Sequence, residues 1–258
     1  METALVTGAT KGVGRGVAVS LATAGFRVFA TGRNIAHASL PDTVIRIPCD
    51  HSKDEQTDAA FGQIVAYKEP LDLLVNSAWG GYERMIEDGQ FTWPLPFWEQ
   101  PQHRWTSMLD AGVRAAFVAS SCAAKIMIPR RRGLIVNISF WAARKHMGNV
   151  IYGVSKAATD KMTSDMAQEL RPHNVAVISL YPGLVRTEAV LRAAEAGWFD
   201  LSNSESPEFI GRVVAALWRD PALFDRSGQV LVAAAVAREL GVRDVDGKQP
   251  EPLTMETT

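Results

Sequence analysis

The 258-residue chain is poor in the residues that build metal centres and disulfide frameworks. Its two cysteines, Cys49 and Cys122, are far apart in the sequence and lack the paired spacing of zinc ligands. Its five histidines are scattered without metal-ligand spacing, so we expect no metal site. Unpaired cysteines suit a reducing compartment, and we therefore expect the protein to be cytoplasmic.

Net charge and long apolar runs are also missing. The 27 lysines and arginines nearly balance 28 aspartates and glutamates, and the net charge of -1 argues against a nucleic-acid partner. The apolar stretch 111–128 is interrupted by Arg114 and Lys125, so it falls short of the about 20 apolar residues of a membrane span. Strand-like sequence begins by Ala4 with no charged leader before it, so we expect neither a membrane span nor a signal peptide.

Short apolar runs alternate with segments of helical period along the whole chain. Near-continuous apolar strands are typical of a parallel sheet that is buried on both faces. The predicted strands are 4–8, 27–32, 44–50, 71–78, 133–139, 175–183 and 229–235. The predicted helices are about 13–24, 53–67, 104–128, 151–171 and 207–219. The pattern predicts one α/β domain over residues 1–258, a doubly wound, Rossmann-like parallel sheet of about seven strands.

Two segments are longer than the usual connections in such sheets. Residues 79–104 are rich in aromatics, proline and glycine, and residues 186–205 are typical of a mobile flap. Both follow the carboxyl ends of strands, where open α/β sheets bind ligands. The aromatic insertion 79–104 is expected either to wall an apolar substrate pocket or to form a small core or an oligomer interface. The last fifteen residues are polar and are expected to form an arm or a frayed tail.

The first predicted strand runs into TGATKGVG, residues 7–14, which opens an amphipathic helix. Glycines at this point remove side chains where backbone N–H groups must approach a pyrophosphate, and the positive end of the helix faces the same point. A tight strand-to-helix turn would use the same glycines. The strand-turn-helix context favours a dinucleotide site.

The position expected to meet the adenine ribose is Gly32, where an Asp or Glu would favour NAD. Arg33 follows it and Lys11 projects from the glycine turn, so two cations face an expected 2′-phosphate. A charge-assisted hydrogen bond of about 1.5–3 kcal/mol would favour NADP(H) over NAD(H) roughly 10- to 150-fold. The alternative is two solvated surface cations. Asp50, after the third strand, is expected either to accept from the adenine amino group or to cap a helix.

Tyr152 and Lys156 lie four residues apart on a predicted helix, and Ser139 ends the fifth strand thirteen residues before the tyrosine. Residues four apart share a helix face, so the ammonium can stabilise the phenolate and lower the tyrosine pKa from about 10. For the pair alone, a structural tyrosine beside a surface lysine is the alternative. The pair follows a strand that ends in Ser139, and this context favours the interpretation of Tyr152 as a proton donor that works near neutral pH.

Taken together, residues 3–240 resemble the short-chain dehydrogenase/reductase (SDR) family. Asn76-Ser77-Ala78 matches the start of the family's N-N-A-G element, and Tyr181–Thr187 matches its P-G-x-V-x-T element. The resemblance implies that Tyr152 is the general acid/base, that Lys156 holds the nicotinamide ribose, and that Ser139 polarises the substrate carbonyl. It implies cofactor-binding roles for Gly8, Thr10, Lys11, Gly12, Val13, Arg33, Asp50, Asn76, Ala78, Tyr152, Lys156, Pro182, Gly183, Val185 and Thr187.

The matched elements differ in their expected roles. In the family, the residue matching Asn76 supports the central sheet beside the cofactor. The backbone of Val185 is expected near the nicotinamide carboxamide, and Thr187 near the pyrophosphate.

The sequence departs from the family pattern at three positions. Trp79 stands where the N-N-A-G element has its glycine, so we expect a rebuilt loop. Gly112 stands where many members have an asparagine that anchors a proton-relay water, and we expect either that a water on main-chain carbonyls serves instead or that turnover is slower. Phe140 follows Ser139 where many relatives have a second serine; the spacing from Tyr152 favours Ser139, whereas strand alignment places Phe140 at the catalytic position.

Within the family, the insertion, Gly112, the YGVSK helix and residues 241–247 look most like the dehydrogenase/reductase member 1 subgroup. The implied activity is NADPH-dependent reduction of a ketone or aldehyde, or oxidation of the alcohol, by hydride transfer. A non-catalytic NADP(H)-binding sensor or scaffold on the same fold is the alternative, motivated by the three departures. The implied partners are a small carbonyl or alcohol substrate and further copies of the chain, as a homodimer or homotetramer.

Overall fold

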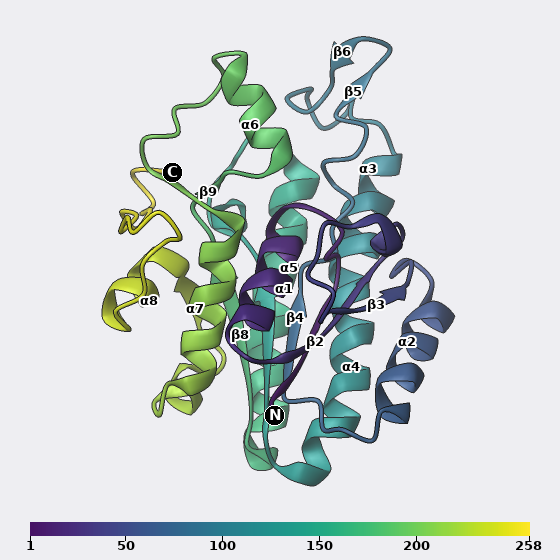
Figure 1. The fold of residues 1–258 in the computed structure, drawn as a ribbon. Coiled ribbons are helices and arrows are strands. Elements are labelled where there is room, and N and C mark those ends of the chain that lie inside the picture. The colour runs from purple at the N-terminus through teal and green to yellow at the C-terminus, as the bar shows by residue number, and fades with distance from the viewer.

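The computed structural model describes all 258 residues and has a parallel seven-stranded sheet with helices on both faces (Figure 1). The strand order is β11-β8-β7-β4-β1-β2-β3. The strands are β1 (Thr3–Val6), β2 (Arg27–Gly32), β3 (Ile45–Pro48), β4 (Leu73–Asn76), β7 (Gly133–Ile138), β8 (Val175–Tyr181) and β11 (Val230–Val232). The order reverses between β1 and β4, which is the point where a doubly wound sheet binds its ligand. The predicted fold class is confirmed.

Eight helices of the α type accompany the sheet. They are α1 (Gly12–Thr23), α2 (Asp54–Ala66), α3 (His103–Trp105), α4 (Ala115–Met127), α5 (Val150–Leu170), α6 (Glu188–Glu195), α7 (Pro207–Arg219) and α8 (Ala233–Glu239). One core joins the sheet to α1, α7 and α8, and the other joins it to α2, α4 and α5. Successive strand residues face opposite sides, so Ala4 and Val6 enter the first core and Leu5 enters the second. Burial on both faces explains the unbroken apolar strands.

The sequence pattern misplaced some boundaries. The expected strand 229–235 ends at Val232, and the following alanines form α8, because Ala233, Val236 and Ala237 repeat at helical spacing and are buried. The expected helix 104–128 contains a π-helical segment, η2 (Thr106–Arg114), between α3 and α4. Wider π-helical turns are frequent at functional sites, and this segment carries Gly112.

The helical run His103–Arg130 is long and apolar enough by composition to be a candidate membrane span, with a mean hydropathy of 1.4 over 18 residues. In the folded chain it covers one face of the sheet, and Ala119, Ala123 and Met127 are fully buried there. The share of the apolar window that is buried in the fold is 39%.

The insertion and the flap both rise above the carboxyl ends of the strands, at the top of Figure 1. The insertion contains a hairpin of β5 (Ile86–Glu87) and β6 (Gln90–Phe91), and the flap contains α6. The two segments meet where the rings of Phe91 and Trp198 lie 5.9 Å apart. The flap returns through β10 (Ser204–Glu205), which pairs with β9 (Leu184–Val185).

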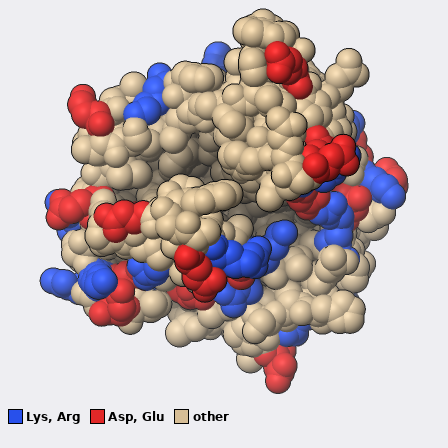
Figure 2. Space-filling model, turned by 90° about the horizontal axis from the view of Figure 1, so that it is seen from above, with Lys and Arg blue, Asp and Glu red and all other residues tan.

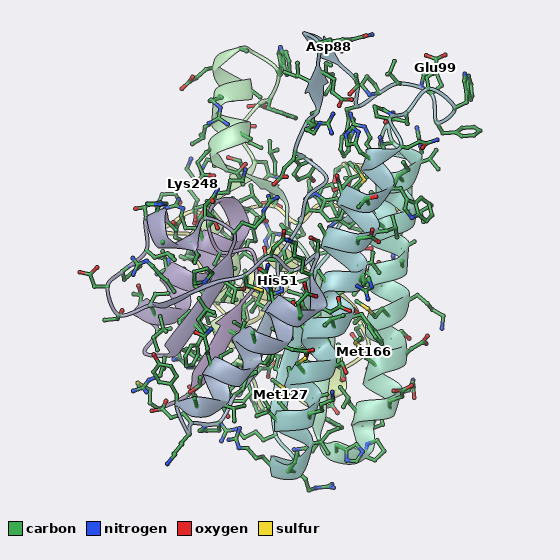
Figure 3. The ribbon with its side chains drawn as sticks, turned by 90° about the vertical axis from the view of Figure 1, so that its right-hand side faces the viewer. His51, Asp88, Glu99, Met127, Met166 and Lys248 are labelled. Atoms are coloured by element: carbon green, nitrogen blue, oxygen red, sulfur yellow. The ribbon has the colours of Figure 1, made fainter.

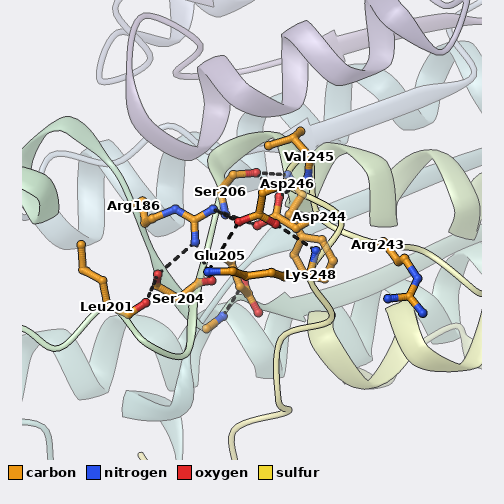
Figure 4. Close-up of polar contacts among 12 residues, drawn as sticks. Arg186, Leu201, Ser204, Glu205, Ser206, Arg243, Asp244, Val245, Asp246 and Lys248 are labelled. Atoms are coloured by element: carbon orange, nitrogen blue, oxygen red, sulfur yellow. Dashed lines mark hydrogen bonds and ion pairs between the residues drawn. The ribbon is translucent and has the colours of Figure 1, made fainter.

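Of the two expectations for the polar tail, an arm or a frayed tail, fraying along its whole length is wrong. Asp244 is buried, and its carboxylate accepts hydrogen bonds from the backbone N–H of Ser206 at 2.8 Å and from Arg186 at 3.1 Å (Figure 4). Farther along, Lys145 Nζ donates to the carbonyl oxygen of Met255. The start of the tail thus ties the flap to the N-terminus of α7.

Candidate active site

The glycine turn after β1 has the close approach that the sequence predicts. Gly8 has a positive φ of 68°, and a Cβ there would lie 2.6 Å from the Cα of Ala78. The backbone N–H of Gly12, at the start of α1, donates to a carboxylate oxygen of Glu188 at 3.0 Å. The turn therefore presents an N–H donor at the positive end of a helix, and this donor already holds an anionic oxygen, so the residues fit a dinucleotide phosphate. Lys11 is exposed beside it, and Val13 packs on the core.

The end of β2 packs closely against the glycine turn. A Cβ on Gly32 would collide with Oγ1 of Thr10, so a side chain there would require the Thr10 hydroxyl to move. Arg33, the next residue, is exposed and forms an ion pair with Glu83 of the insertion. The structure thus brings a cation to the expected ribose position but also gives it an internal anionic partner.

Asp50 does not cap a helix, so that alternative is wrong. Helix α2 begins at Asp54 with Lys53 as its N-cap residue, whereas the Asp50 carboxylate accepts from the backbone N–H and the hydroxyl of Ser52. Burial opposes ionisation, but the bonds from Ser52 and the nearby Arg33 outweigh it and lower the pKa of Asp50. Its adenine role stays a prediction.

Asn76, at the end of β4, joins the polar groups that link the central strands. Its Nδ2 donates to the hydroxyl of Ser120 at 2.9 Å and to Oδ1 of Asn137 at 2.8 Å. Asn137 in turn donates to Thr163 on α5 at 2.8 Å. This chain of buried bonds fixes α5 against the sheet, as a supporting residue should, and Asn137 and Thr163 were missed by sequence reasoning. Polar residues inside apolar strand and helix patterns are the sign that could have indicated them.

The Pro182–Thr187 element ends beside the glycine turn. Val185 is buried in the short β9–β10 pairing, and Gly183 donates its N–H to a carboxylate oxygen of Glu205 at 2.8 Å. Thr187 caps α6, and its Cγ2 is 3.4 Å from the position of a Cβ on Gly12. The structure therefore brings the two predicted cofactor-binding elements together.

Tyr152, Lys156 and Ser139 meet below the insertion. Asn149 caps α5 by accepting from the backbone N–H of Tyr152, which fixes the first turn of that helix. Lys156 Nζ donates to the carbonyl oxygen of Ile138 at 3.3 Å, and the Ser139 hydroxyl donates to the carbonyl oxygen of Lys156 at 3.4 Å. All three predicted residues are buried.

The predicted lowering of the tyrosine pKa is wrong for this arrangement. Burial, followed by the neighbouring Tyr82, raises the pKa of Tyr152 well above its usual range, and burial lowers the pKa of Lys156 to about 8. The ammonium lies 4.1 Å from the ring centroid of Trp79 and 5.9 Å from that of Tyr152. Because the ammonium faces the indole, desolvation outweighs charge stabilisation of the phenolate.

Three aromatic side chains of the insertion surround Tyr152. The Tyr82 hydroxyl lies 3.1 Å from the Tyr152 hydroxyl, at hydrogen-bonding distance. The rings of Trp79 and Trp93 lie 5.9 and 5.3 Å from the Tyr152 ring. Seen from above, the surface is hollowed between mainly uncharged walls, with charged groups around them (Figure 2). The first half of the insertion thus lines the site, whereas Trp98 is largely exposed.

Trp79 and Gly112, two of the departures from the family pattern, pack against each other. A Cβ on Gly112 would lie 2.9 Å from two ring carbons of Trp79, so the indole uses the space that an asparagine side chain would need. Phe140 packs into the small apolar cluster around Tyr152 and Met108. Sequence reasoning singled out the aromatic insertion but missed the individual contacts of Tyr82, Glu83 and Glu188.

Comparisons with known proteins agree with this geometry. A family model described as short chain dehydrogenase matches residues 2–196. Dehydrogenase/reductase SDR family member 1 is 37% identical in Mus musculus and 36% identical in Homo sapiens, and each alignment covers 96% of this chain and 84% of the relative.

A solved short chain dehydrogenase/reductase family protein is 29% identical, with a TM-score of 0.72 over 90% of this chain and 94% of its own. The similarity thus extends along almost the whole chain, and the seven-stranded parallel sheet is the fold of this family. The chain belongs to the short-chain dehydrogenase/reductase family and is, by that membership, an NAD(P)-dependent dehydrogenase/reductase.

Proposed function

We propose that this protein is an NADPH-dependent carbonyl reductase in which Tyr152 protonates the oxygen of a bound ketone or aldehyde. The observation that carries the proposal is the hydroxyl of Tyr82, 3.1 Å from that of Tyr152 inside the aromatic walls. It marks a place where an oxygen atom fits within proton-transfer distance of the buried phenol. A substrate carbonyl takes that place when Tyr82 withdraws.

NADPH supplies the hydride when it is bound, whereas the protein orients the cofactor and the substrate and provides the charged groups around them. The glycine turn and Thr187 would hold the pyrophosphate, and the backbone of Val185 would hold the carboxamide. Lys156, with a pKa of about 8, is mostly protonated at neutral pH and can donate to the nicotinamide ribose. Its ammonium also favours the tyrosinate that forms when Tyr152 gives its proton to the substrate oxygen.

Ser139 holds the substrate oxygen. Its bond to the Lys156 carbonyl is long, at 3.4 Å, and a hydroxyl can rotate to donate to a carbonyl that enters the site. Tyr152 would give its proton to the carbonyl oxygen, and the bound cofactor would supply the hydride for the carbonyl carbon, so the products would balance as an alcohol and the oxidised cofactor. Trp79 and Trp93 favour a substrate whose substituents are apolar.

Preference for NADPH over NADH rests on the end of β2. Gly32 offers no carboxylate to bind a free ribose hydroxyl, and Arg33 offers a guanidinium to a 2′-phosphate.

The test is the Tyr152→Phe variant, which keeps the ring and removes the proton. We expect its kcat for carbonyl reduction to fall by roughly 10²-fold or more, while NADPH binding measured by fluorescence is retained. Tyr67→Phe is the matched control, because that exposed ring packs on Phe29, away from the site. Unchanged turnover in Tyr152→Phe would remove the tyrosine from the mechanism.

A non-catalytic NADP(H) sensor is the second candidate, favoured by the position of Tyr82 on Tyr152 and of Trp79 over Lys156. A panel of ketones, aldehydes and quinones, followed by NADPH absorbance, separates the two candidates. Binding of NADPH without oxidation by any compound would favour the sensor.

A further inference from the structure

Two carboxylates from two different segments lie on the groups that would receive the phosphates of a dinucleotide. Glu83 of the insertion pairs with Arg33, at the expected position of a 2′-phosphate. Glu188 of the flap accepts from the N–H of Gly12 at 3.0 Å and lies 3.3 Å from Nε of Arg15, at the expected position of the pyrophosphate.

We propose that Glu83 and Glu188 are internal competitors of the cofactor phosphates, and that Glu83 makes opening of the substrate site depend on a 2′-phosphate. The proposal rests on the cofactor preference given under the proposed function. A phosphate monoester carries up to two negative charges and three acceptor oxygens, so it displaces a single carboxylate from a guanidinium.

The two competitors differ in what displaces them. The pyrophosphate is common to NADH and NADPH, so either cofactor must displace Glu188 from Gly12. Only NADPH carries a phosphate for Arg33, so NADH leaves Glu83 in place. Glu83 therefore adds a selectivity step that Arg33 alone does not provide.

The link to the substrate site is the chain itself. Tyr82, the residue before Glu83, holds its hydroxyl 3.1 Å from that of Tyr152, and its ring lies 6.0 Å from that of Trp79. Because Tyr82 and Glu83 are adjacent in the chain, a large backbone movement that takes Glu83 away from Arg33 also shifts Tyr82. Release of Glu83 by a 2′-phosphate therefore loosens Tyr82, which occupies the position proposed for the substrate oxygen.

The variants Glu83→Gln and Glu188→Gln remove each charge at constant size, and cofactor affinity is measured by calorimetry. We expect Glu83→Gln to bind NADPH about two- to fivefold more tightly, the range for an exposed ion pair, with NADH affinity unchanged. We expect Glu188→Gln to bind both cofactors more tightly, by similar factors. Because glutamine can still accept from Gly12, Glu188→Ala should show at least as large an effect.

The matched controls are Glu99→Gln in the insertion and Glu195→Gln in the flap. Figure 3 shows Glu99 at the outer end of the insertion, and both side chains are exposed. Neither control should change either affinity. If Glu83→Gln changes NADPH and NADH affinity equally, or neither, Glu83 does not compete with the 2′-phosphate and the inference is overturned, whereas the reductase proposal stands.

The coupling is tested with cofactor fragments that cannot reach Tyr152. We expect adenosine 2′,5′-bisphosphate to increase amide hydrogen exchange across residues 80–85, and 5′-ADP to leave it unchanged. The response should be lost in Glu83→Gln, where exchange is already raised. Equal responses to both fragments would overturn the coupling. If wild-type protein binds NADPH no better than NADH, both the proposed cofactor preference and this inference are overturned.

Discussion

The indole of Trp79 lies in the space that a side chain at Gly112 would occupy, with two ring carbons 2.9 Å from the position of a Cβ there. One residue comes from the loop after β4 and the other from the π-helical turns of η2. The large residue and the glycine therefore depend on each other. The same indole covers the Lys156 ammonium, so this packing also sets the surroundings of Lys156 and of Tyr152, the proposed proton donor.

We predict that Gly112→Asn destabilises the protein and that the same substitution costs much less stability when Trp79 has already been replaced by glycine (Trp79→Gly). Overpacking of this kind costs about 1–3 kcal/mol, and contacting residues couple by about 0.5–3 kcal/mol. The measurement is a double-mutant cycle of unfolding free energies in urea. Gly62→Asn is the control, because a Cβ at that helical glycine meets nothing within 4 Å. An equal cost of Gly112→Asn with and without the indole would show that Trp79 is not its partner.

We predict that Arg33→Ala weakens NADPH binding far more than NADH binding. Loss of a charge-assisted bond of about 1.5–3 kcal/mol corresponds to roughly 10- to 150-fold in the dissociation constant for NADPH. Both constants are measured by fluorescence titration. Lys125→Ala, an exposed charge on α4 with no role in the cleft, should change neither. Similar losses for both cofactors would show that Arg33 does not recognise the phosphate.

The fold and the gathering of Ser139, Tyr152 and Lys156 were predictable because their causes are local. The strands are apolar on both faces, and Tyr152, Lys156 and Ser139 are separated by spacings that a strand and a helix convert directly into proximity. Gly8 follows the same logic, because its positive φ is a property of the turn itself.

The remaining features depend on where the insertion and the flap lie. Neither segment has the regular spacing of apolar residues from which its position could be predicted. Glu83 meets Arg33 and Glu188 meets Gly12 only in three dimensions. The direction of the Tyr152 pKa shift was predicted wrongly for the same reason. The four-residue spacing indicates a nearby ammonium, but Trp79 and Tyr82 decide how deeply the phenol is buried.

Glu205 gives the last prediction, which concerns stability against pH. Its side chain is 1% exposed beside Asp244, and burial raises its pKa from 4.5 to about 7, although the N–H of Gly183 and the charge of Arg186 oppose the rise. Between pH 4.5 and 7 the folded protein therefore retains a proton that the unfolded chain releases. Stability from this group is complete below pH 4.5 and is lost as the pH rises toward 7.

Glu205→Gln keeps the acceptor for Gly183 and removes the titration. We expect the variant to gain stability relative to wild type between pH 5 and pH 7, by on the order of 2–3 kcal/mol, with no further change above pH 8. Thermal unfolding at unit pH intervals measures the difference, and Glu195→Gln, exposed on α6, should show no such trend. A stability difference independent of pH would mean that Glu205 is ionised in the folded protein, held by Arg186 and Gly183 more strongly than burial opposes it.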